Sequence, residues 1–196
     1  MNENNSMKWC SVEFVERLQK QVIDICTKHR LLGGEFYIVD ELNERWRISA
    51  PEYMANAVPE IPHYPTVAIA WACYYGMGAA SLWDGAWERV KDIPDLYVDI
   101  RDKRGFDNLD DYVIEGLMDI HADRNAVDAE NAKRLTSTIQ DCAELAHTLI
   151  RKECIEPQSI EAFHMFAKTT EVFFKLGVSL ALFGLGYKYE KMTIGN

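Results

Sequence analysis

The spacing of apolar residues predicts helices along most of the chain. Downstream of Ser11, a residue that suits a helix N-cap, apolar side chains recur at three- and four-residue steps through about Leu32. Gly33 and Gly34 then mark a helix end. No segment keeps the two-residue alternation of a half-buried strand. The pattern therefore indicates an all-α protein.

One segment, 66–83, carries no charged residue. It is long enough to span a membrane, but it is rich in Ala, Gly, Tyr and Ser, and no cluster of Lys and Arg flanks it. A helix that is apolar on most faces is typical of the middle of a bundle. We therefore expect a central buried helix over 66–90 and no membrane span.

Two long helices are expected at the C-terminal end. Asn125 can cap one helix over about 126–154, Pro157 interrupts the chain, and Ser159 can cap another over about 159–187. Small residues recur along the central helix and along the last one, which predicts close packing of the two backbones. The small residues are Ala68, Ala72, Gly76 and Ala80 in the first, and Gly177, Ala181 and Gly184 in the second.

The pattern is less clear between the first and the central helix. Residues 35–49 favour a helix, with a short hairpin as the alternative, and the capping-box pattern of 49–52 predicts a short helix over about 50–58. Three prolines make 59–65 an extended connector. Further on, caps at 92–95 and at Asp107 predict helices to about 103 and 121.

These elements make an irregular bundle of about six or seven helices around the helix at 66–90. We expect a flexible N-terminal tail over 1–10 and a single all-α domain over 11–196.

Composition narrows the function classes. The net charge of −10 disfavours binding to nucleic acid and to anionic membrane surfaces, because both require a basic face. The five Cys residues form no C-x-x-C pair, and the polar N-terminus is not a signal peptide. A reducing, cytoplasmic location is therefore expected.

A repeated Glu-x-x-His pattern is the first candidate for chemistry. It occurs as Glu144–His147 and as Glu161–His164, and ferritin-like di-metal bundles place two such pairs in their core. On a helical wheel, however, both His residues fall at the edge of the apolar face and both Glu residues fall outside it. We therefore favour a structural role over a metal site.

Two acidic features are further metal candidates. Asp119, His121 and Asp123 would face one way in a strand, but in the expected helix His121 turns away from the two carboxylates. The wider acidic region over 92–128 could hold a divalent metal and phosphates, yet it lacks the paired Glu-x-x-Glu and Glu-x-x-Asp motifs of helical nucleotide pyrophosphatases. Helix capping explains most of these Asp residues better.

Aromatic residues concentrate along the central helix and its entry. They favour core packing and a subunit interface, with an aromatic-lined pocket for an organic ligand as the alternative. The candidate ligand-binding residues are His63, Tyr64, Trp71, Tyr75, Trp83 and Trp87.

We therefore expect a non-enzymatic helical module that binds another protein or self-associates as a homo-oligomer, with no predicted cofactor. The alternative is a metal-dependent hydrolase that uses the acidic 92–128 region or the Glu-x-x-His pairs.

Overall fold

The computed structural model describes residues 12–188, all of whose regular elements are helices. This confirms the all-α prediction; the expected tail at 1–10 lies outside the described residues. Short 3₁₀ turns (η1, Val58–Glu60, and η2, Phe106–Asn108) and a π-helical turn (η3, Tyr112–Leu117) join the α-helices. The α-helices are α1 (Val12–Lys28), α2 (Asp40–Ala57), α3 (Pro65–Val90), α4 (Leu96–Arg104), α5 (Leu109–Asp111), α6 (Ala126–Lys152) and α7 (Ile160–Gly184).

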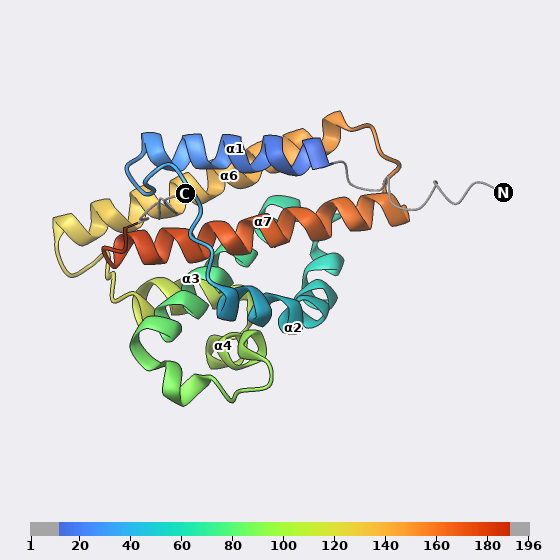
Figure 1. Ribbon diagram of the computed structural model, residues 1–196. Coiled ribbons are helices and arrows are strands. Elements are labelled where there is room, and N and C mark those ends of the chain that lie inside the picture. The colour runs from blue at the N-terminus through green and yellow to red at the C-terminus, as the bar shows by residue number, and fades with distance from the viewer. Residues whose placement is uncertain (1–11, 189–196) are drawn as a thin grey trace, which may run out of the picture.

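Helix α3 is the centre of the bundle, as the sequence predicts. Every residue from Ala68 to Ala80 is buried, and α3 contacts α2, α4, α6 and α7 (Figure 1). A helix enclosed in this way must be apolar on most faces, which accounts for its lack of charge over 66–83. None of the helices within residues 12–188 is long and apolar enough to cross a membrane.

The backbones of α3 and α7 lie in direct contact. A Cβ on Gly76 would collide with the backbone carbonyl of Phe174, and a Cβ on Gly177 would collide with that of Cys73. The two helices run in the same direction, because Ile69 and Phe166 share a groove near their starts and Trp83 contacts the chain just after α7. The predicted packing of α3 on α7 is therefore confirmed. Gly184, which the prediction placed in the second stripe, lies outside the contact, because nothing lies within 4 Å of a Cβ added there.

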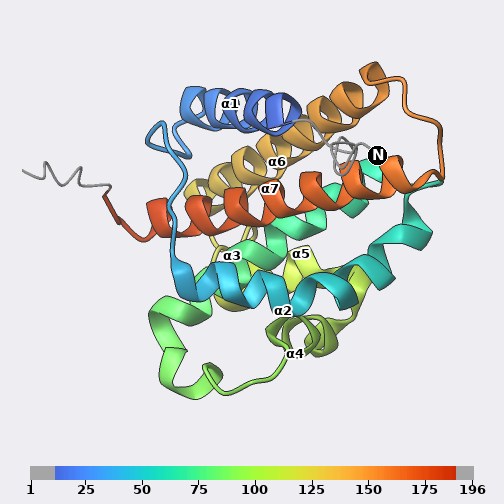
Figure 2. The ribbon, with the colours of Figure 1, turned by 45° about the vertical axis from the view of Figure 1, so that its right-hand side comes forward.

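Helices α1 and α6 pack against α7 and α3 on the side opposite α2 and α4 (Figure 2). They run antiparallel, and an ion pair between Arg17 and Glu153 joins the start of α1 to the end of α6. Toward the other end of α1, the buried sulfur atoms of Cys26 and Cys142 lie 3.8 Å apart. Both thiols are free and act as small apolar core residues.

The prediction for 35–58 is wrong in its boundaries. Neither a helix nor a hairpin forms over 35–39, and a single helix, α2, runs from Asp40 to Ala57 with Pro51 inside it. Ser49 does not cap a second helix, because its buried hydroxyl donates to Asp95 and accepts from Tyr75. Tertiary hydrogen bonds have replaced the local capping box.

Other boundaries also differ from the prediction. Helix α1 ends at Lys28, before the glycine pair, because Arg30 adopts a left-handed conformation (φ 60°) and Leu31 N–H donates to the Cys26 carbonyl. The connector at 59–65 is a 3₁₀ turn followed by a turn, instead of an extended segment. The helix expected from Asp107 to about 121 is divided into η2, α5 and η3.

Three predicted caps are confirmed. The side chain of Asp95 accepts from the backbone N–H groups at the start of α4, Asn125 does so at α6, and Ser159 does so at α7. Each is a short polar residue in the extended conformation just before the helix, so each satisfies N–H groups that have no partner within the helix.

Replacing Gly177 or Gly76 by Ala will destabilise the protein by about 3 kcal/mol or more, because the methyl group meets a backbone carbonyl that cannot rotate away. Gly184→Ala is the matched control on α7, since nothing lies within 4 Å of the added carbon. Chemical denaturation measures all three variants. Equal stability of the Gly177 and Gly184 variants would contradict the proposed backbone contact.

Candidate ligand-binding groove

An apolar groove lies where four segments of the described structure meet. It encloses about 550 Å³, within the range of about 300–1,000 Å³ that is typical of ligand pockets. The turn after α2, the start of α3, the end of α6 and the start of α7 form its walls, and Figure 2 shows these segments at one end of the bundle. The lining residues are Val58, Ile61, Pro62, Pro65, Ile69, His147, Ile150, Arg151, Ile155, Pro157, Gln158, Ser159, Ala162, Phe163 and Phe166.

The groove exposes apolar side chains that the rest of the fold leaves uncovered. Phe163 is 44% exposed and Val58 is 37% exposed, whereas Phe166, one turn after Phe163, is buried. Single exposed apolar residues are ordinary, but several that line one concave surface favour binding. The apolar face of α7 therefore continues beyond the core into the groove.

None of the polar side chains that line the groove is acidic. His147 and Arg151 lie one turn apart on α6, and Gln158 and Ser159 belong to the turn before α7. Burial lowers the pKa of His147, and the nearby charge of Arg151 lowers it further. Arg151 is exposed and forms no ion pair with any residue from 12 to 188. The groove therefore has a cationic rim at α6.

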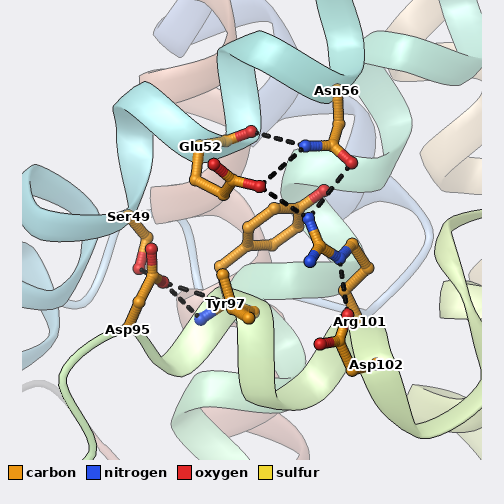
Figure 3. A network of polar contacts seen from close by, with 8 residues as sticks. Ser49, Glu52, Asn56, Asp95, Tyr97, Arg101 and Asp102 are labelled. Atoms are coloured by element: carbon orange, nitrogen blue, oxygen red, sulfur yellow. Dashed lines mark hydrogen bonds and ion pairs between the residues drawn. The ribbon is translucent and has the colours of Figure 1, made fainter.

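A second concentration of polar groups joins α2 to α4. Arg101 of α4 donates to Glu52 at 2.8 Å and to Asn56 at 3.2 Å, both on α2, and it also pairs with its neighbour Asp102 (Figure 3). The guanidinium lies 5.6 Å from the ring centroid of Tyr97. These contacts hold α4 against α2, and each of the charges has a partner.

A second series of hydrogen bonds links α3, α2 and the N-cap of α4. The Tyr75 hydroxyl donates to Ser49 at 2.9 Å, and the Ser49 hydroxyl donates to Asp95 at 2.6 Å. Asp95 also accepts from the N–H groups at the start of α4. Burial raises the pKa of Tyr75, so this hydroxyl stays protonated and keeps its role as a donor. These hydrogen bonds orient α4, and the hydroxyl groups of Tyr75 and Ser49 both have acceptors.

The structure distributes the six aromatic candidates over several places. Tyr75 lies fully buried in an aromatic cluster, and Trp71 packs on Phe106 with ring centroids 4.0 Å apart. Trp83 and Trp87 are half-buried near the end of α3. His63 and Tyr64 are exposed before its start. The six side chains therefore do not line one pocket. The aromatic cluster comprises Trp46, Tyr53, Tyr75, Tyr97 and Phe174.

The two Glu-x-x-His pairs are not gathered into one site. Glu144, Glu161 and His164 are exposed, and Glu144 accepts from Gln140 on its own helix. His147 alone of the four lines the groove. Within residues 12–188, no group of three or more His, Cys, Asp or Glu side chains is arranged to hold a metal ion.

The helix expected to reach about residue 121 ends at Leu117, so 119–123 lies in a loop, which an ion pair stabilises. Arg124 donates to the carboxylate of Asp119 at 2.6 Å, and His121 lies 3.2 Å from the same carboxylate. The hydrogen bond from Arg124 lowers the pKa of Asp119, and His121 adds to this effect. Asp123 is exposed. Asp119 itself has a left-handed backbone (φ 55°), which ends the preceding π-helical turn.

The sequence pattern did not reveal the groove, because its walls come from distant segments. Ile61, Ile150 and Ile155 are ordinary apolar residues when each is taken alone. Helical spacing places Phe163 on the apolar face of its helix, but that spacing does not show that nothing covers the ring.

Comparisons with known proteins add no relative. No protein-family model matches the chain, and no curated protein or solved structure shows significant similarity to it. The groove must therefore be interpreted from its own geometry.

Ser49→Ala will destabilise the protein by about 1–3 kcal/mol, because it leaves the buried Tyr75 hydroxyl without its acceptor. The control is Ser137→Ala, since the exposed Ser137 bonds only within its own helix and its loss should change the free energy of unfolding by no more than about 0.5 kcal/mol. Urea denaturation followed by circular dichroism compares the two. Similar free energies of unfolding for the two variants would show that the hydrogen bonds of Ser49 do not stabilise the protein.

The pKa of His147 should lie below its ordinary value in the native protein, because burial and the charge of Arg151 both lower it. It should rise in Arg151→Gln, because that variant removes the charge. It should stay below the ordinary value in that variant, since burial remains. NMR titration of the His ring protons measures this, with Lys152→Gln as the control. A pKa that does not respond to Arg151→Gln would place the two side chains farther apart than the structure has them.

Proposed function

We propose that this protein is a non-enzymatic binding protein and that it takes an elongated apolar small molecule in the groove between α3, α6 and α7. The observation that carries the proposal is the combination of a concave apolar surface of about 550 Å³ with the partly exposed ring of Phe163 at its edge. Ligand pockets are typically concave, mostly apolar and supplied with a few polar groups. The groove has all three properties.

The free energy for binding would come from removing apolar surface from water. Full burial of a Phe side chain is favourable by about 1.5–3 kcal/mol. Phe163 is 44% exposed, so a ligand against it gains part of that amount, and the Ile and Pro side chains of the other walls add to it. All of the groove residues come from one chain, so the groove can hold a small molecule without a second copy.

Phe163→Ser will weaken the binding of Nile red, an uncharged apolar dye, by about tenfold, because a loss of about 1.4 kcal/mol of apolar contact corresponds to that factor. Fluorescence titration measures the dissociation constant. Val127→Ser is the matched control: Val127 is 68% exposed near the start of α6 and does not line the groove, so its replacement should leave dye binding unchanged.

Light scattering of the same proteins tests the competing occupant, a second copy of the chain. A monomeric wild type that binds the dye at one site supports the proposal. A wild-type oligomer that Phe163→Ser dissociates would identify the groove as a subunit interface and would overturn it. Equal dye binding by the Phe163 and Val127 variants would overturn it as well.

A further inference from the structure

The charge of the groove differs from that of the rest of the molecule. The chain has 31 Asp and Glu residues against 21 Lys and Arg, yet none of the residues that line the groove is acidic. Three other hollows in the described structure each contain at least one acidic residue. In an acidic protein, a groove that has cationic and neutral polar side chains but no carboxylate favours an anionic ligand.

We propose that the occupant of the groove is a single-chain amphiphile with a carboxylate head, whose apolar chain lies against α3 and α7 and whose head pairs with Arg151. This inference rests on the proposed binding function and specifies its ligand. The apolar walls account for the chain of the ligand. The guanidinium at the α6 side of the same groove, which has no ion-pair partner within residues 12–188, accounts for the head.

The geometry of a guanidinium suits one carboxylate. Its planar fork of N–H donors matches the two oxygen atoms of a carboxylate in a bidentate pair. His147, one turn earlier on α6, and Ser159, in the turn before α7, add a ring nitrogen and a hydroxyl to the groove lining. A phosphate dianion would call for more positive charge than one Arg residue supplies.

The net charge of −10 does not prevent this interaction. At physiological ionic strength the Debye length is about 8 Å, so exposed carboxylates farther away than that act on the ligand only weakly. Arg151 is the one full positive charge of the lining at neutral pH. The acidic residues nearest to the lining in sequence, Glu60, Glu153, Glu156 and Glu161, do not line the groove, and Glu153 pairs with Arg17. Local charge therefore decides the sign of the preferred ligand.

Three probes that share a ten-carbon chain separate the head from the chain: decanoate, decan-1-ol and decyltrimethylammonium. Isothermal titration calorimetry below the concentration at which the probes aggregate measures the dissociation constants. We expect decanoate to bind about fivefold more tightly than decan-1-ol, which is the effect of one partly exposed charged pair, and decyltrimethylammonium to bind most weakly.

Arg151→Gln should remove the preference for decanoate and leave the affinity for decan-1-ol unchanged. Lys152→Gln is the matched control, since Lys152 is the adjacent exposed cation on α6 and does not line the groove. It should retain the full preference. Circular dichroism of both variants verifies that the helices are intact.

The outcomes distinguish the two proposals. If decan-1-ol binds as tightly as decanoate, or if Arg151→Gln and Lys152→Gln behave alike, the carboxylate inference is overturned while the apolar groove stands. If no probe binds, or if Phe163→Ser leaves the binding of all of them unchanged, the binding function itself fails.

Discussion

The fold depends on the contact between the backbones of α3 and α7. Gly76 and Gly177 each face a backbone carbonyl of the opposite helix, so the two helices lie closer together than any side chain would allow. That approach replaces two layers of side chains by direct backbone packing, and it encloses α3 so fully that every residue from Ala68 to Ala80 is buried. The remaining helices pack around this pair.

The groove is a consequence of how this helix pair begins. Toward the starts of α3 and α7 the small residues give way to Ile69, Phe163 and Phe166, and here the pair meets the turn after α2 and the end of α6. Bulky side chains from four segments surround a hollow at this end, whereas glycines close the middle of the interface. The close contact that stabilises the core and the groove at its end are therefore parts of one arrangement.

The polar groups of the molecule serve different purposes at the two places where they gather. Between α2 and α4, Arg101 and its partners Glu52 and Asn56 are mutually satisfied, and Ser49 links Tyr75 to Asp95. Such a network orients elements and leaves little capacity for a ligand. At the groove, in contrast, the guanidinium of Arg151 has no ion-pair partner among the described residues. This difference, more than the number of charges, makes the groove the better candidate for binding.

Several properties follow from the sequence alone, because they depend on neighbours within one or two helical turns. The all-α class, the central place of the uncharged helix and the caps at Asp95, Asn125 and Ser159 are of this kind. The packing of α3 on α7 could also be predicted, since small residues at four-residue steps let two helix backbones approach closely. Only the tertiary structure decided that Ser49 would bond to Tyr75 and Asp95 instead of capping a helix. It likewise decided that four separate segments would meet around an open groove. The physical reason is that hydrogen bonds and burial between distant segments contribute free energies as large as those of local capping, and the spacing of residues along the chain does not contain them.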